Sequence, residues 1–176
     1  MTVGRITVLT NPASGHGSAS HAAERAITQF HRRGVDVVAI AGSDAEHARR
    51  LVEGALERGM DALVVVGGDG IVALALQVLA QTDIPLGIIP AGTGNDHARE
   101  FGIPTKDPEA AADVIVDGRA ETIDLGRIRG AITVPNHLSV PSAPMMRPRS
   151  TVCAVPSTTT SAAASGSFVG IRNSRA

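Results

Sequence analysis

The chain has 176 residues, of which 43% are hydrophobic, 19% charged and 2% aromatic, and its formal net charge is −1. These values suit one globular domain, and the low charge together with the lack of Trp and Tyr argues against a nucleic-acid partner. No apolar run approaches the ~20 residues that span a bilayer, and the N-terminus lacks the apolar core of a signal peptide. The single cysteine, Cys153, has no internal disulfide partner. We therefore expect a cytoplasmic protein without a membrane span.

Residues 1–130 alternate between short apolar strands and amphipathic helices, and glycine, proline or a capping residue marks each change. In chain order the pattern predicts a strand at 5–10, a helix from 19 that stops at Gly34, a strand at 35–40, a helix that ends at Gly59, a strand at 62–66, a helix at 70–81, a strand at 85–90, a short helix from about Asn95, a helix at 107–118 and a strand at 120–128. Ser43 and Glu46 form a predicted capping box for the second helix. Apolar strands alternating with helices indicate the α/β class, with a parallel sheet covered on both faces.

The composition changes near Gly130. All 17 Asp and Glu residues lie before it, and residues 131–176 contain five of the ten prolines and the run "VPSTTTSAAASGS". This tail has no sustained helical or strand period, so it is predicted to be loop or disordered. A natural flexible tail is one explanation of the change.

The first of three polar loops at the carboxyl edge of the predicted sheet is "NPASGHG", residues 11–17. Its Ser14, Gly15 and Gly17 stand before a helix start, where bare N–H groups favour an anion. It is neither a Walker A loop nor a complete dinucleotide fingerprint. Taken alone, an ordinary tight turn accounts for it as well as a phosphate site does, and His16 is either a phosphate contact or simply solvated.

The second loop is "GGDG", Gly67 to Gly70, and it holds one carboxylate, Asp69. Glycines let a ligand approach the backbone closely, and the carboxylate can hold Mg²⁺ or its waters. The alternative is that Asp69 only caps the helix that follows it. Capping explains the Asp but not the glycines around it, so the pattern favours a binding role.

The third loop is "IPAGTGNDHA", residues 89–98, where Gly92 and Gly94 free the backbone, Thr93 offers a hydroxyl, and Asn95 and Asp96 can cap a short helix. Ligands of open α/β sheets bind at the carboxyl ends of the strands. Three such loops at one edge together predict a cradle for nucleotide phosphates.

These three motifs, in this order and spacing, resemble the catalytic domain of the diacylglycerol kinase family, which includes bacterial lipid kinases and sphingosine and ceramide kinases. More distantly the chain looks like NAD kinases and phosphofructokinases. The resemblance covers residues 3–128 and implies a three-layer α/β/α parallel sheet. It also implies an ATP-dependent lipid kinase of phospholipid metabolism that phosphorylates a diacylglycerol-like hydroxyl.

The resemblance also implies roles for individual residues. Those expected to bind the nucleotide are Asn11, Ser14, Gly15, Gly67, Gly68, Asp69, Gly70, Gly92, Thr93 and Asn95. Asp69 would be catalytic, and Asp69, Asp96 and Asp124 would organise Mg²⁺ as the second cofactor beside ATP. The implied partner is a lipid at the membrane surface, which adds peripheral membrane contact to the cytoplasmic location and leaves a homodimer open.

The sequence departs from the family pattern in several places. Ile71 stands where Thr usually follows GGDG, "VALAL" replaces an Asn-Glu pair, and His16 stands where Lys is common. Family enzymes continue into a β-rich second domain, so we expect a kinase domain at 1–128, a non-family tail at 129–176, and truncation or a frameshift near Gly130. The alternatives are a nucleotide-binding remnant without catalysis and, ranked lowest, an NAD-kinase-like enzyme.

Overall fold

The computed structural model describes residues 4–11, 17–80, 82–118, 120–128, 132–135 and 149–154. The strands are β1 (Arg5–Thr10), β2 (Asp36–Ala41), β3 (Ala62–Gly67), β4 (Leu86–Pro90), β5 (Ala120–Ile128), β6 (Ile132–Pro135) and β7 (Arg149–Ala154). The helices are α1 (Ser18–Arg32), α2 (Ala45–Arg58), α3 (Asp69–Leu79), α4 (Asp96–Glu100) and α5 (Pro108–Asp117). From β1 to β5 the predicted order of elements is confirmed.

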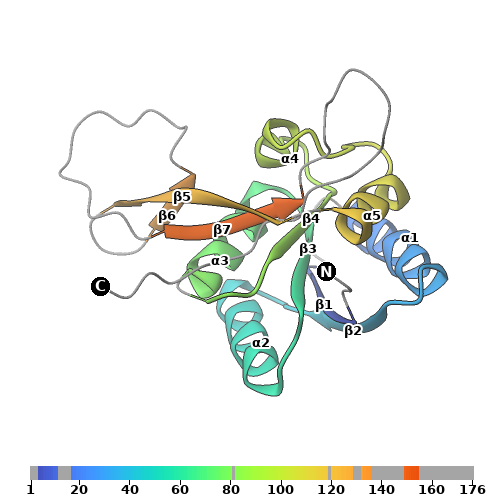
Figure 1. Cartoon of the computed structure of the whole chain (residues 1–176), viewed down its shortest axis with the longest axis horizontal. Helices are drawn as coiled ribbons and strands as arrows, with labels where there is room; N and C mark the ends of the chain where they lie inside the picture. The colour runs from blue at the N-terminus through green and yellow to red at the C-terminus, as the bar shows by residue number, and fades with distance from the viewer. Residues whose placement is uncertain are drawn as a thin grey trace.

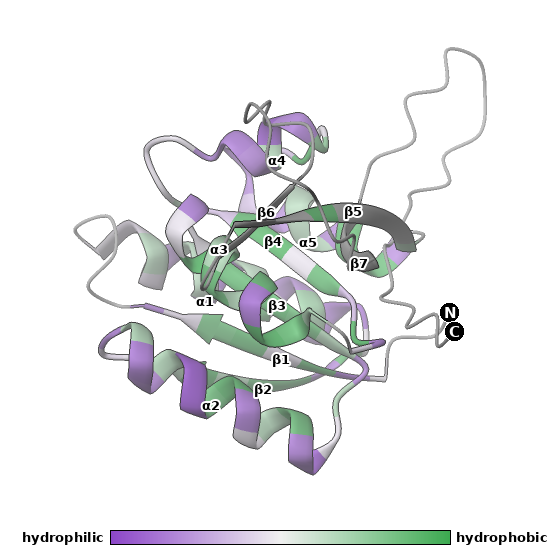
Figure 2. Ribbon diagram, turned by 90° about the vertical axis from the view of Figure 1, so that its left-hand side faces the viewer, coloured by the Kyte–Doolittle hydropathy of each residue, from purple (hydrophilic) through white to green (hydrophobic). Residues whose placement is uncertain are grey.

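Four parallel strands form the centre of the fold, in the order β2-β1-β3-β4 (Figure 1). Helices α1 and α5 pack together on one face of this sheet, and α2 and α3 pack together on the other. Every residue of β3 and β4 is buried, which explains why these strands are continuous apolar runs rather than alternating ones. In Figure 2 the central strands are mainly hydrophobic, whereas hydrophilic residues recur along α2. The predicted three-layer α/β/α fold class is therefore confirmed.

The start of α2 differs in one detail from the predicted capping box. Asp44, not Ser43, is the N-cap, because its carboxylate accepts the amide N–H of His47 at 2.8 Å. The Ser43 hydroxyl instead donates to the Asp44 carboxylate at 2.9 Å. The cap of α5 is as predicted: Asp107 accepts two amide N–H groups of the first turn, and Pro108 opens the helix.

A polar clamp joins α1 to α5 and fixes the helices on their face of the sheet. The Arg33 guanidinium pairs with Asp113 at 2.6 Å and also with Asp117, and these hydrogen bonds raise the pKa of Arg33. Nearer the other end of α1, Arg25 pairs with Glu109. The clamp matters for the site because the first residue of α1, Ser18, reaches the loop after β4.

Strand β5 lies where the sequence predicts a strand, but it pairs outside the parallel sheet. It is the middle strand of an antiparallel sheet with the order β6-β5-β7. Strands β6 and β7 fall in the segment that the composition assigns to loop or disorder, so that assignment does not hold for these short stretches. The rest of the predicted tail, residues 129–131, 136–148 and 155–176, lies outside the described residues.

Candidate functional site

The carboxyl ends of β1, β3 and β4 lie at one edge of the sheet because the three strands are parallel neighbours. The chain leaves β1 toward α1 on one face and leaves β3 toward α3 on the other. The crevice between these two strand ends is the place where open α/β sheets bind ligands. Asn11 directly follows β1, and Gly68 directly follows β3. The predicted site residues Ser14 and Gly15 lie outside the described residues.

The β3–α3 and β4–α4 loops are fastened to each other through their backbones. The amide of Ala91 donates to the Gly67 carbonyl at 3.0 Å. A β-carbon built on Gly92 would lie 2.5 Å from the Cα atom of Gly68, which no real side chain tolerates. Loop–loop packing therefore accounts for the glycine at position 92, which the sequence interpretation attributed to ligand approach, and it leaves little room for a side chain at Gly68, where a β-carbon would lie 3.3 Å from the Cα atom of Gly92.

Gly70 differs from these two glycines. It is exposed in the first turn of α3, and a β-carbon there would have no heavy atom within 4 Å. Packing does not require a glycine at this position, and a glycine near a helix start weakens the helix relative to alanine. The first-turn amides of a helix also carry partial positive charge. Gly70 thus leaves a bare, anion-favouring surface at the start of α3, and Thr93 in the loop after β4 is also exposed.

Asp69 is a cap, but not of the following helix that the capping alternative named. Helix α3 has Gly68 as its N-cap, and the Asp69 carboxylate instead reaches across to the first turn of α4. Its Oδ2 accepts the amide of Asp96 at 3.1 Å, and its Oδ1 accepts the amide of His97 at 3.1 Å. The Nδ1 atom of His97 lies 2.7 Å from the same Oδ1. One side chain therefore ties the GGDG loop to the start of α4.

Asn95 precedes α4 but does not cap it, because its side chain braces its own loop. The Asn95 amide group donates to the Gly92 carbonyl at 2.6 Å and accepts from the Gly92 amide at 3.0 Å. The residue is buried and has a φ of 56°, in the left-handed region that Asn tolerates. The predicted cap role of Asn95 is thus taken over by Asp69.

The hydrogen bonds around Asp69 keep it ionised. Burial alone would raise the pKa of its carboxyl, but the hydrogen bonds from the His97 ring and from the amides of His97 and Asp96 outweigh burial, and the pKa falls below its ordinary value. A carboxylate can only accept hydrogen bonds, so Nδ1 of His97 must carry the hydrogen that it shares with Asp69.

Gly94 lies beside the carboxylates of Asp69 and Asp96. A β-carbon built on Gly94 would lie 2.8 Å from Oδ2 of Asp69 and 3.9 Å from Oδ2 of Asp96, so a side chain at this position would crowd the Asp69 carboxylate. Among the described residues no group of three or more acidic, His or Cys side chains could hold a metal ion. Mg²⁺ takes one or two carboxylates and keeps several waters, so Asp69 and Asp96 are the described residues that would hold it. Asp124 lies in β5 opposite Arg149, and its side chain lies outside what is described.

A comparison with family models identifies residues 5–128 as a diacylglycerol kinase catalytic domain. The chain belongs to this family. The predicted resemblance, placed at residues 3–128, is therefore confirmed. The family is one of lipid kinases.

Named relatives of this kinase family agree with the match. A diacylglycerol kinase of Mycobacterium tuberculosis (strain ATCC 25618 / H37Rv) is 66% identical over 127 residues, which are 72% of this chain and 41% of the relative. A diacylglycerol kinase of Bacillus subtilis (strain 168) is 34% identical over 128 residues, 72% of this chain and 42% of the relative. A crystal structure of a diacylglycerol kinase from Bacillus anthracis str. Sterne shares the fold with a TM-score of 0.65 and 24% identity, over 75% of this chain and 46% of that one. The chain thus spans less than half the length of the relatives that it matches.

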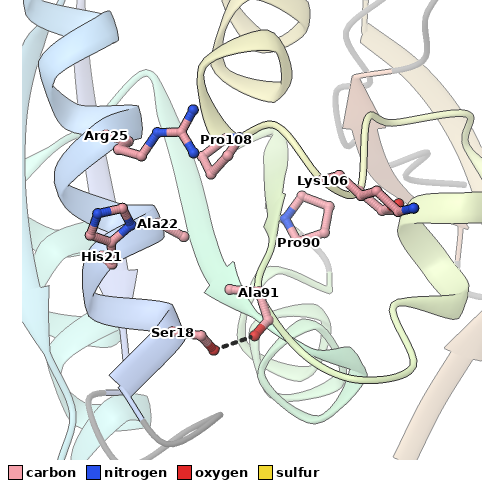
Figure 3. Close-up of a pocket in the computed structure, with 9 residues that line it drawn as sticks. Ser18, His21, Ala22, Arg25, Pro90, Ala91, Lys106 and Pro108 are labelled. Carbon is pink, nitrogen blue, oxygen red and sulfur yellow. Dashed lines mark hydrogen bonds between the residues drawn. The ribbon is translucent and has the colours of Figure 1, made fainter.

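The kinase-family chain also has a pocket on the α1 and α5 side that the sequence did not predict. Its volume is about 350 Å³, and its lining residues are Ser18, His21, Ala22, Arg25, Pro90, Ala91, Thr105, Lys106 and Pro108. In Figure 3 the amino group of Lys106 points away from α1, and the Ser18 hydroxyl is bonded to the Ala91 carbonyl at 3.1 Å. Because Arg25 is paired with Glu109, no free cation is aimed into this pocket by the residues shown. Its residues come from separate segments without a shared motif, so no sequence pattern marks it.

Within the described segments, the kinase-family chain has no helix that is both apolar and long enough to span a bilayer.

Proposed function

We propose that this chain carries the nucleotide-binding part of an ATP-dependent lipid kinase. The reaction is transfer of the γ-phosphoryl group to a hydroxyl of a diacylglycerol-like lipid: a bond from the lipid oxygen to phosphorus forms as the bond to the β-phosphate oxygen breaks. The observation that carries the proposal is the pair Asp69 and Asp96 beside Gly94, in the loops after β3 and β4, inside a region that matches the family.

The individual roles follow from the geometry of the loops. The exposed first turn of α3 at Gly70 and the hydroxyl of Thr93 would receive the phosphates, since amide N–H groups and the helix dipole favour anions. Asn11, at the end of β1, would lie near the adenine nucleotide. Asp69 and Asp96 would hold Mg²⁺ or its waters, and the ion would offset the negative charge of the phosphates.

The lipid acceptor determines where the enzyme would act. A diacylglycerol-like lipid resides in a bilayer, so the enzyme would act as a peripheral protein at a membrane surface on the cytoplasmic side. We place the boundary of the nucleotide-binding unit at residue 128, where the family match ends.

A second candidate is nucleotide binding without catalysis. It is favoured by the fact that the acids of the described site are already committed: Asp69 holds the start of α4, and Asp96 pairs with Arg99. Neither is left as a base for the lipid hydroxyl. Ile71 also stands where the family usually has a Thr hydroxyl beside the phosphates. This candidate expects ATP binding with negligible turnover.

Two measurements test these candidates. Calorimetry of ATP binding with and without Mg²⁺ should show metal-dependent binding under both, and its absence in well-folded protein would contradict both. Transfer of labelled phosphate from ATP to diacylglycerol in detergent micelles then decides between them. Product formation supports the kinase, and binding without product supports the remnant. Labelling of NAD in place of the lipid would instead indicate the NAD-kinase-like alternative.

A further inference from the structure

Helix α4 brings the imidazole of His97 against the carboxylate of Asp69, a residue 28 positions earlier in the chain. The contact between Nδ1 and Oδ1 is 2.7 Å, and the His97 side chain is only 13% exposed. Because the carboxylate only accepts, the ring is a donor aimed at one oxygen of the acid.

The two oxygens of Asp69 have different surroundings. Oδ1 receives both the ring and the backbone amide of His97. Oδ2 receives the amide of Asp96, and it is the oxygen that faces Gly94, where a built β-carbon would lie 2.8 Å from it. Of these three hydrogen bonds, only the one from the ring depends on the side chain at position 97.

We propose that His97 is a positioning residue for the metal ion of the nucleotide complex. By holding Oδ1, its ring sets the carboxylate so that Oδ2 faces Gly94 on the side of Asp96. The inference rests on the proposed function, and it gives a role to His97, which lies within the third motif but has no assigned part in it. Loss of such an outer partner of a metal-binding group typically costs ~10–100-fold in metal affinity.

Three variants separate positioning from simple packing. His97→Phe removes the donor and keeps an aromatic ring, whereas His97→Asn keeps a donor close to the place of Nδ1. His31→Phe is the matched control, because His31 is an exposed histidine in the last turn of α1, away from the site. The probes are Mn²⁺ alone, followed by electron paramagnetic resonance, and the Mg²⁺ dependence of ATP binding, followed by calorimetry.

We expect His97→Phe to weaken Mn²⁺ binding and to raise the Mg²⁺ midpoint by ~10-fold or more, with metal-free ATP binding unchanged. His97→Asn should recover most of the affinity, and His31→Phe should match the parent protein. A purely structural role would lower the unfolding temperature and would weaken ATP binding equally with and without metal, and that result would overturn the proposal.

Other outcomes are equally decisive. The positioning role of His97 would also be overturned if His97→Phe kept its metal affinity, or if His97→Phe and His97→Asn lost metal affinity equally. If His97→Phe does not fold, His97→Asn decides, since retained affinity supports positioning and a tenfold loss contradicts it. If the parent protein shows no metal-dependent ATP binding, the proposed function itself is refuted. If the parent protein binds Mg²⁺-ATP and His97→Phe has the same metal affinity, only the role of His97 is refuted.

Discussion

Replacing Asp69 with alanine should produce two losses that can be measured apart. The first is stability, because the carboxylate joins the GGDG loop to α4 through two backbone amides and the His97 ring. The amide contacts equal an N-cap, worth ~1 kcal/mol. A hydrogen bond to a charged group adds ~1.5–3 kcal/mol, which we discount because the Asp69 side chain is 31% exposed and the freed donors can turn to water. Urea denaturation should therefore show a loss of about 2 kcal/mol.

The second loss is metal-dependent binding. Calorimetry of ATP at several Mg²⁺ concentrations should show at least a tenfold weaker complex for Asp69→Ala, equal to ~1.4 kcal/mol or more, while metal-free ATP binding changes little. Asp69→Asn is the sharper variant. It keeps the size of the side chain and one acceptor oxygen, so it should retain part of the cap while losing the negative charge that a cation needs.

The control is another capping aspartate. Asp107 accepts the amides of Glu109 at 3.1 Å and Ala110 at 3.2 Å at the start of α5, outside the candidate site. Asp107→Ala should lower stability without changing the Mg²⁺ dependence. If Asp69→Ala behaves like this control, losing stability but binding Mg²⁺-ATP as the parent protein does, then Asp69 is only a cap and the metal role is wrong.

Three further outcomes follow from the same geometry. Gly92→Ala should lower the free energy of unfolding by ~1–3 kcal/mol in urea denaturation, because the new β-carbon would overlap Gly68, and an unchanged stability would contradict this assignment. Gly70→Ala should instead raise the free energy of unfolding by up to ~1 kcal/mol while weakening ATP binding, and an unchanged ATP affinity would contradict the binding role. Arg33→Ala should lower stability by roughly 1 kcal/mol, since its partly exposed ion pairs clamp α1 to α5, and the loss should shrink in 1 M salt. The lowered pKa of Asp69 gives stability that is present above about pH 4 and is lost as the pH falls through the folded-state pKa. Acid unfolding curves of the parent protein and Asp69→Asn should therefore converge at low pH and separate above about pH 4.

The sequence predicted the parallel sheet and the position of its loops because both depend on local signals. Apolar runs bounded by glycine and proline mark strands whatever their partners, and strand–helix alternation leaves few topologies. The start of α2 shows the limit of such signals. Ser43 and Asp44 are adjacent capping residues, and only the hydrogen bond from the His47 amide shows that Asp44 is used.

The role of Asp69 could not be read from its neighbours in the chain. Local rules assign an Asp before an apolar helix to that helix, but its hydrogen-bond partners lie 27 and 28 residues away. The ring of His97 was missed for the same reason. Likewise, the composition of the tail gives no sign of β6 and β7, because these strands depend on antiparallel pairing with β5. Contacts that depend on tertiary structure carry no periodic signal.

Capping and metal binding by Asp69 are compatible roles rather than competing ones. A carboxylate oxygen that accepts one hydrogen bond keeps a second lone-pair site, so Oδ2 can hold the amide of Asp96 and still face a cation. The hydrogen bonds that cap α4 also fix the rotamer of the acid during folding. A cation arriving beside Gly94 would then not have to immobilise this side chain, a cost of ~0.5–1.5 kcal/mol for a flexible one. The contact between Gly68 and Gly92 acts in the same direction, because it sets the two loops before any ligand binds.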